Sequence, residues 1–126
     1  MNTVLTALTR DAVSEKSRPD DPLCGARVVF EGVVRGEENG RTIEGLHYEA
    51  YEKMAGKLMR DLGEKLLGEF GCRQMSIVHR LGFVPVGQVA VRVEVTSSHR
   101  AEAFACAARC MDLLKTEVPI WKRTDE

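Results

Sequence analysis

The stretch TSSHRAEAFACAARCMDLLKTEVPIWK, residues 96–122, predicts a long amphipathic helix with basic residues near both of its ends. Ser97 or Ser98 is expected to cap the start of the helix, because a short hydroxyl side chain can accept a hydrogen bond from a free N–H group there. Pro119 cannot continue the helix, and Ile120 should open a last, short extended segment. The expected apolar face of the helix consists of Ala103, Cys106, Ala107, Cys110, Met111 and Leu114.

Alternating apolar residues predict several strands on the N-terminal side of this helix. The clearest pattern is at residues 89–95, where valines alternate with other residues as in a half-buried strand. Gly32 lies inside a similar run and is expected to mark a β-bulge. Strands are expected at residues 3–9 (a short edge strand), 25–34, 46–51, 75–79 and 89–95.

Turn-forming and polar residues predict how these strands are connected. Residues 10–22 are polar and are expected to form a short helix followed by a loop. Asn39 and Gly40 form the dipeptide that favours a tight hairpin turn, after which the chain returns as a strand. Residues 83–87, with a proline and a glycine, are expected to be a connection without a strand.

A second helix is predicted from about Glu52 to Phe70, because its apolar residues recur every three or four positions. Gly71 is placed to cap its C-terminal end. Two long helices among several strands indicate an α+β architecture. A chain of 126 residues is expected to form one domain, residues 1–126.

The net charge of -1 gives no reason to expect nucleic acid or an acidic membrane as a partner. No apolar run approaches the length of a membrane span, and the N-terminus lacks the basic and apolar blocks of a secretory signal. The four cysteines are therefore expected to be thiols in a reducing compartment, the cytoplasm. Cys106 and Cys110 are interpreted as small buried side chains, since no second Cys or His pair has the spacing of a metal site.

Basic residues at the two ends of the long helix are the candidates for a binding site. His99 and Arg100 follow the expected cap, where free N–H groups attract anions. The alternative is a pair of solvated residues that oppose the helix dipole. Lys115, in the last turn, is favourable for the dipole alone, and Lys122 could be an ordinary solvated charge. Arg35 could bind an anion or belong to a plain turn.

The length of the helix limits how these residues can work together. From His99 to Lys115 the helix would extend about 24 Å, at 1.5 Å per residue. The two ends of one helix cannot then contact the same small ligand. If they share a ligand, two chains must contribute, which favours a symmetric homodimer whose pockets contain residues of both protomers.

Five motifs of the sequence together are similar to a known enzyme family. In chain order they are VVFEGVVRG, LHYEAY, IVHRLGFVPVG, VEVTSSHRAEAF and MDLLKTEVPIWKR, and they resemble the catalytic (large) subunit family of molybdopterin synthase over about residues 25–123. The resemblance implies an α/β hammerhead fold with an additional small antiparallel β subdomain. Family members usually continue beyond the last motif, so the family's C-terminal tail is expected to be absent or short in this sequence.

The resemblance also implies a reaction and its partners. Molybdopterin synthase forms the dithiolene of molybdopterin from cyclic pyranopterin monophosphate, a step of molybdenum cofactor biosynthesis. The sulfur comes from a small ubiquitin-like carrier subunit, as a thiocarboxylate on its C-terminal glycine. Two large subunits form a homodimer at the core of a heterotetramer, with one carrier at each end. No cofactor and no metal is implied, since molybdenum enters at a later step.

Residue by residue, the resemblance implies that Lys115 is the catalytic lysine and Lys122 the second lysine of the active site. Arg35, His99 and Arg100 correspond to the family's basic substrate-binding residues, and Lys115 and Lys122 are expected to bind the substrate as well. Lysine can act as a general acid or base in such a sulfurtransferase. An alternative is a non-catalytic module that binds a ubiquitin-like sulfur carrier, and a plain anion-binding domain is a third. Intact Lys115 and Lys122 favour the enzyme over the second hypothesis, and the absence of a glycine-rich phosphate loop disfavours the third.

Overall fold

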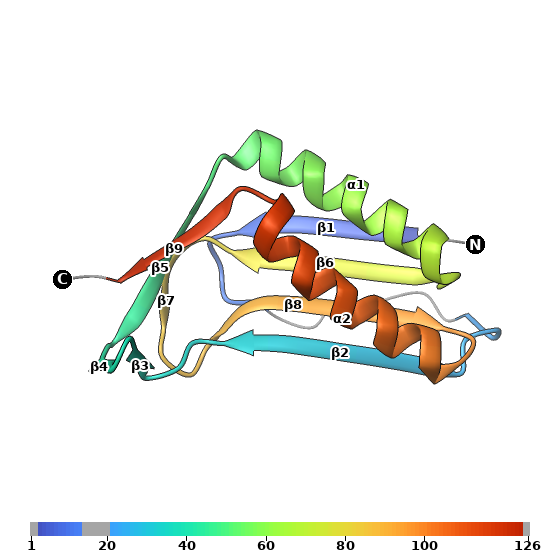
Figure 1. Ribbon diagram of the computed structural model, residues 1–126, viewed down its shortest axis with the longest axis horizontal. Coiled ribbons are helices and arrows are strands. Elements are labelled where there is room, and N and C mark those ends of the chain that lie inside the picture. The colour runs from blue at the N-terminus through green and yellow to red at the C-terminus, as the bar shows by residue number, and fades with distance from the viewer. Residues whose placement is uncertain (1–2, 14–20, 125–126) are drawn as a thin grey trace.

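The computed structural model describes residues 3–13 and 21–124 of the chain (Figure 1). Its elements combine strands and helices as an α+β fold, in agreement with the sequence analysis. In chain order they are β1 (Thr3–Thr9), β2 (Ala26–Val33), β3 (Glu37–Glu38), β4 (Arg41–Thr42), β5 (Gly45–Ala50), α1 (Glu52–Phe70), β6 (Gln74–Arg80), β7 (Gly82–Pro85), β8 (Val89–Ser97), α2 (Arg100–Glu117) and β9 (Ile120–Thr124).

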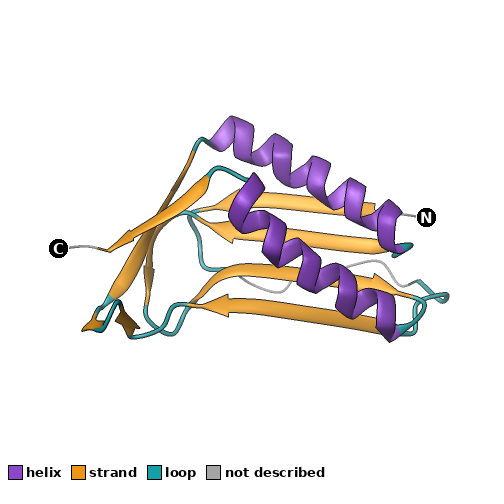
Figure 2. Cartoon of the chain, viewed as in Figure 1, coloured by secondary structure: helices purple, strands orange, loops and turns teal. Residues whose placement is uncertain are grey.

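The larger sheet has the strand order β1-β6-β8-β2, and both helices cover one of its faces (Figures 1 and 2). β1 runs parallel to β6, whereas β8 is antiparallel to both β6 and β2. The expected edge strand at residues 3–9 is therefore confirmed. The register of β2 against β8 shifts between Gly32 and Val33, which confirms the expected bulge.

The central strand β8 is more buried than its alternating pattern predicts. Val93 and Val95 pack under the helices, in the main core. On the other face Arg92 and Glu94 are also buried, and Nη1 of Arg92 lies 3.0 Å from Oε1 of Glu94. The expectation of a half-buried strand at 89–95 is wrong, because both faces of β8 are buried, and the ion pair between Arg92 and Glu94 offsets part of the cost of removing their charges from water.

The two helices have nearly the bounds that their patterns predict. α1 covers Glu52–Phe70, and Gly71 ends it in the left-handed conformation, with φ of 69°. α2 buries most of its expected apolar face, but Met111 is only half-buried and Leu113, absent from the expected face, is buried. The apolar stripe is thus rotated slightly from the expected one, because α2 also packs beside α1.

A smaller antiparallel sheet, β7-β5-β9, lies beyond one end of the larger sheet (Figure 2). β5 pairs with β7 and with β9, not with β2. The expectation of a plain connection at residues 83–87 is wrong, because Gly82–Pro85 forms a strand against β5. Burial explains this outcome, since Leu46 and Val84 face each other in a second apolar cluster.

The hairpin β3-β4 extends from this end of the molecule. Asn39 and Gly40 both have positive φ, 53° and 77°, as a tight hairpin turn requires. The expected turn is therefore confirmed. The helix expected within residues 10–22 is not observed in residues 10–13, which form a bend, and residues 14–20 lie outside the described part.

The cysteines of the described residues are free thiols. Cys106 and Cys110 are fully buried in the main core, and burial raises the pKa of each thiol to about 12. They are therefore small apolar core residues, as expected. Among the described residues, no group of three His, Cys, Asp or Glu side chains is arranged to hold a metal ion. Neither α1 nor α2 combines the length and apolar character that a membrane-crossing helix needs.

Candidate functional site

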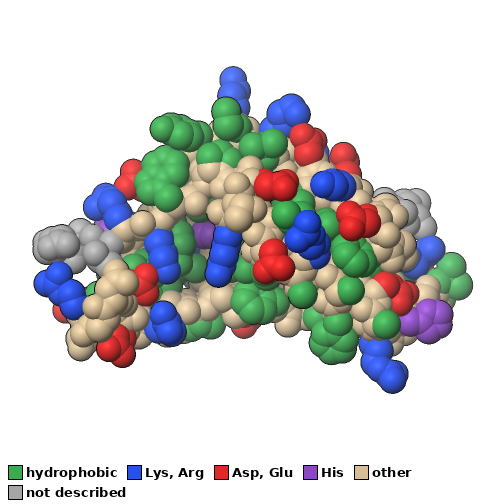
Figure 3. Space-filling model, viewed as in Figure 1, with side chains coloured by type: hydrophobic (Ala, Val, Ile, Leu, Met, Phe, Trp, Pro, Cys, Tyr) green, Lys and Arg blue, Asp and Glu red, His purple; other side chains and the backbone are tan. Residues whose placement is uncertain are grey.

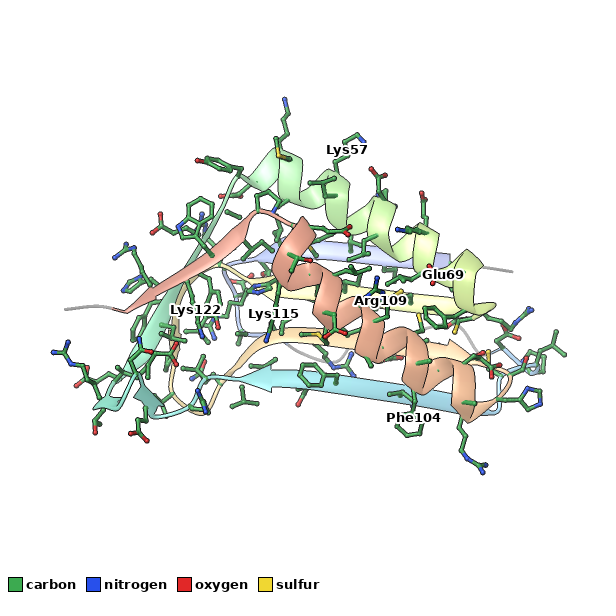
Figure 4. The ribbon with its side chains drawn as sticks, in the orientation of Figure 1. Lys57, Glu69, Phe104, Arg109, Lys115 and Lys122 are labelled. Atoms are coloured by element: carbon green, nitrogen blue, oxygen red, sulfur yellow. The ribbon has the colours of Figure 1, made fainter. Side chains whose placement is uncertain are left out.

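Two lysines lie where the C-terminal end of α2 meets the smaller sheet. Lys115 is exposed in the last turn of α2, and Lys122 is exposed on β9 (Figure 4). Pro119 ends the helix region, and β9 then pairs with β5. Figure 3 shows Lys and Arg side chains gathered around a hollow at this junction. The short corner between α2 and β9 thus keeps two lysines seven positions apart on one side of the molecule.

Lys122 and Arg35 share one carboxylate, that of Glu38. Nζ of Lys122 lies 2.8 Å from Oε2 of Glu38, and Nη2 of Arg35 lies 3.7 Å from Oε1 of the same residue. The hydrogen bond from Lys122 lowers the pKa of the Glu38 carboxyl, and the charges of Lys122 and Arg35 add to this effect. Glu38 is therefore an anion at neutral pH and connects two residues that are distant in sequence.

An aromatic pair lies beside this cluster. Tyr48 is directly opposite Lys122 in the register of β5 against β9. Burial raises the pKa of the Tyr48 phenol, which therefore remains a neutral hydrogen-bonding group. Its ring contacts His79 edge-on, with 5.0 Å between the centroids. Burial lowers the pKa of His79, so this imidazole is neutral near pH 7 and adds no charge to the site.

His99 and Arg100 lie at the opposite end of α2. His99 is the N-cap residue, with φ of -132° and ψ of 158°, and Arg100 is the first residue of the helix. The expectation that Ser97 or Ser98 is the cap is wrong, because Ser97 is still part of β8 and fully buried. The side chain of Glu102 instead accepts hydrogen bonds from the His99 backbone N–H, at 3.1 Å, and from the Ser97 hydroxyl, at 2.9 Å.

The exposed side chains of His99 and Arg100 leave them available to another molecule. The His99 side chain is 83% exposed, and its Nδ1 lies 3.7 Å from Glu102. Arg100 is also exposed. The helix between Arg100 and Lys115 keeps the two ends more than about 20 Å apart within one chain. The structure thus connects Arg35 and Lys122 through Glu38, has Lys115 at the same end of α2, and leaves His99 and Arg100 at the other end.

Sequence reasoning does not find Glu38 or Tyr48. An acidic residue beside a hairpin turn carries no local signal of function, and Tyr48 has the pattern of an ordinary strand residue. Their proximity to Lys122 depends on the pairing of β9 with β5 and on the position of the β3-β4 hairpin. The alternation in LHYEAY could have indicated only that Tyr48 and Leu46 share one face of a strand.

Comparison with known proteins places this arrangement in one family. The model of the MoaE protein family matches residues 5–117. A protein of Thermoplasma volcanium named molybdopterin synthase catalytic subunit is 36% identical over 90% of this chain and 80% of its own length. The protein of the same name from Pyrococcus abyssi is 43% identical, over 81% of this chain and 70% of its own length.

Other relatives are longer. The molybdopterin synthase catalytic subunit of Homo sapiens is 36% identical over 81% of this chain, and the match covers 54% of its length. The chain thus spans about half the length of that human relative. The alignment with the human protein nevertheless includes most of this chain, and the unmatched residues belong mainly to the human protein.

Solved structures agree with the sequence matches. A crystal structure of molybdopterin synthase from Staphylococcus aureus superposes with a TM-score of 0.87 at 32% identity, covering 94% of this chain and 88% of that chain. A complex of subunits 1 and 2 of the molybdopterin-converting factor from Helicobacter pylori matches with a TM-score of 0.69 at 28% identity, covering 81% of this chain and 66% of that chain. Family model, relatives and structures agree: the chain belongs to the MoaE family, whose named relatives are molybdopterin synthase catalytic subunits.

Proposed function

We propose that this chain is the catalytic subunit of a molybdopterin synthase and transfers sulfur to cyclic pyranopterin monophosphate. The sulfur donor is the C-terminal thiocarboxylate of a small ubiquitin-like carrier, and the product is the dithiolene of molybdopterin. The observation that carries this proposal is the position of Lys115 and Lys122 at one junction, with Arg35 linked to Lys122 through Glu38. This is the end of α2 at which the family motif MDLLKTEVPIWKR lies.

The chemistry of the ligands fits such a cluster. A thiocarboxylate and a cyclic phosphate are both anions, which Lys and Arg bind through charge-assisted hydrogen bonds. Lys115 is exposed, and among the described residues no ion pair holds its side chain, so it can turn toward a bound anion and act as the general acid or base of the transfer. Lys122 and Arg35 orient the anions. His99 and Arg100 bind the phosphate of the substrate.

The carrier is the protein partner in this proposal. The related Helicobacter pylori structure is a complex of subunits 1 and 2 of the molybdopterin-converting factor. We propose that a homologous small subunit inserts its C-terminal tail at the junction of α2 and β9. A carrier at each end of a homodimer gives the heterotetramer.

The homodimer in this proposal accounts for the distance between the two basic clusters. Along the outer side of α2, Phe104 is 60% exposed, Ala108 is exposed and Met111 is half-buried (Figure 4). Phe30, on the edge strand β2 beside this helix, is 40% exposed. These four residues form an apolar strip that we propose is covered by a second copy of the chain.

The symmetry of that contact supplies the missing half of the site. A twofold axis perpendicular to α2 and near Ala108, the middle of the helix, makes the two helices antiparallel. The start of each helix then lies beside the end of its partner. Arg100 of one protomer reaches the region of Lys115 in the other, which a single chain cannot achieve.

Three broader expectations belong to the same proposal. The α+β arrangement corresponds to an α/β hammerhead, with β7-β5-β9 as the additional antiparallel subdomain. Residues 1–126 form a single domain. The enzyme works in the cytoplasm, where the free thiols of Cys72, Cys106 and Cys110 are compatible with a reducing environment.

Incubation with a thiocarboxylated carrier and cyclic pyranopterin monophosphate tests the proposal. The expected result is a dithiolene product that accumulates with time and requires the thiocarboxylate. A carrier that ends in an ordinary carboxylate is the matched control. Tight binding of the carrier without any product would contradict the enzyme and support the alternative, a non-catalytic module for a ubiquitin-like carrier.

A further inference from the structure

Lys115, Lys122, Arg35 and Glu38 form a charged cluster at the C-terminal end of α2. Glu38 is its least solvent-exposed member. Its side chain is 15% exposed, whereas those of Lys122 and Arg35 are 50% and 82% exposed. Glu38 is also held by the β3-β4 hairpin, whose turn at Asn39 and Gly40 is tight. The carboxylate is therefore the fixed member of this group, and the two cations are the members that can move toward a ligand.

Glu38 already contacts the Lys122 ammonium and the Arg35 guanidinium, which are the donors that a bound anion would need. One N–H of the Lys122 ammonium points to Oε2 of Glu38 at 2.8 Å, and the Arg35 guanidinium lies 3.7 Å from the other oxygen. An anion that approaches Lys122 meets the negative charge of Glu38 within a few ångströms. Two anions this close repel each other, so an anion that binds Lys122 competes with Glu38 for the same ammonium group.

We propose that Glu38 is the resident counter-anion of this site: it holds Lys122 and Arg35 together before a ligand binds, and an anionic group of the ligand then replaces it on Lys122. Glu38 thereby limits the affinity for any anion and keeps the basic cluster from binding unrelated anions tightly. It is a positioning residue and does not touch the reacting atoms. This inference rests on the proposed function, because it assigns the anion-binding part of that site.

The Glu38→Gln variant separates this role from a structural one. Glutamine retains the shape of the side chain and an oxygen that can accept a hydrogen bond from Lys122, but it removes the charge. Inorganic sulfate is a suitable probe, because its charge is constant near neutral pH. At pH 7 and low ionic strength, Glu38→Gln should bind sulfate about five- to tenfold more tightly than the wild type by calorimetry.

Glu37→Gln is the matched control, because Glu37 is the exposed neighbour in the same strand and its substitution changes the net charge equally. Its sulfate affinity should stay within about twofold of the wild type, since a solvated charge is screened. A Lys122→Ala background provides the second control. There the gain from Glu38→Gln should largely disappear, because the two side chains act as a coupled pair.

A direct measurement follows the Glu38 carboxyl itself by NMR titration. The Lys122 hydrogen bond holds its pKa low, so saturating sulfate should raise this pKa toward the ordinary value. Sulfate affinity in Glu38→Gln equal to or weaker than in the wild type would overturn the inference. A Glu38 pKa that sulfate leaves unchanged would overturn it as well.

These tests do not depend on turnover. A protein that binds sulfate as expected but forms no dithiolene would refute the proposed function and leave the role of Glu38 intact. A protein that forms dithiolene, but whose sulfate affinity does not depend on Glu38, would refute the role of Glu38 and leave the proposed function intact.

Discussion

The two ends of α2 both carry basic residues, but these side chains have different surroundings in the fold. At the C-terminal end, β9 turns back along β5, so Lys122 joins Glu38 and Arg35 near Lys115. At the N-terminal end, β8 leads through Ser98 and His99 into the helix, and Nδ1 of the exposed His99 side chain lies 3.7 Å from the carboxylate of Glu102. One end is built into a cluster within the chain, whereas the other ends in exposed side chains. The comparison teaches that one chain cannot bring the two ends of α2 to the same small ligand, so the proposed site needs a second protomer.

The largest effect is expected at the C-terminal end. Lys115→Ala should lower the rate of dithiolene formation by at least about 100-fold, because a general acid or base contributes this much or more. The fold should be retained, since the Lys115 side chain is exposed and little packing is lost. Single-turnover assays with the thiocarboxylated carrier measure the rate, and circular dichroism monitors the fold.

Lys57→Ala is the matched control for this variant. Lys57 is an exposed helical lysine on α1, paired with Asp61 at 2.9 Å and distant from the cluster in Figure 4. Its activity should equal that of the wild type. Normal product formation by Lys115→Ala would show that Lys115 has no catalytic role. The two ends of α2 would then not differ in function in the proposed way.

Mixing two variants tests whether the two ends meet across a dimer, at a substrate concentration at which neither variant is active alone. Lys115→Ala and Arg100→Ala protomers should regain about a quarter of the wild-type activity when recombined at equal amounts, since half of the dimers are mixed and each has one intact pocket. Unfolding and refolding the mixture promotes exchange, and native mass spectrometry of tagged protomers verifies it. Verified mixed dimers without any activity would show that the ends of α2 serve separate sites.

A smaller effect is expected for ligand binding at the N-terminal end alone. Arg100→Ala should weaken binding of the pterin phosphate by about 1.5–3 kcal/mol, the usual contribution of a charged hydrogen bond. His99→Ala should act in the same direction. Fluorescence titration of the pterin provides the affinities. Wild-type affinity in both variants would contradict phosphate binding and support the alternative, in which His99 and Arg100 are solvated residues at a helix start.

The smallest effect concerns how the N-terminal end is held in place. Ser97→Ala should lower the free energy of unfolding by about 1–2 kcal/mol, because the buried hydroxyl no longer donates to Glu102. Ser98→Ala should change it little, since Ser98 is exposed. Urea denaturation measures both. Equal stabilities would assign no role to the Ser97–Glu102 contact in fixing the helix start.

Much of the fold could be predicted because its signals are local. The period of the apolar residues and Gly71 defined α1, and alternation located β2, β5 and β8, while β1 and β6 were also expected as strands. The strand β7 was missed because its proline and glycine suggested a connection, while its pairing with β5 is made across α1 and β6. Long-range pairing of this kind leaves no periodic pattern in a four-residue segment.

The helix cap shows the same limit on a smaller scale. Ser97 and Ser98 were the two expected caps, because serine has a high intrinsic preference for this position, and His99 was expected to follow the cap. The sheet decides among them, because β8 continues through Ser97 and buries it. Tertiary burial therefore displaced the cap to a residue that propensity alone would not select.

The sequence by itself determined the α+β class, the bounds of α1 and the motif that contains Lys115 and Lys122. These properties depend on residue type and on spacing along the chain, which need no knowledge of distant contacts. Only the tertiary structure decided that Arg35 and Lys122 share Glu38, and that Tyr48 lies opposite Lys122. The physical reason is that burial in the second apolar cluster orders the smaller sheet, and its strand pairing then brings together side chains more than 70 positions apart.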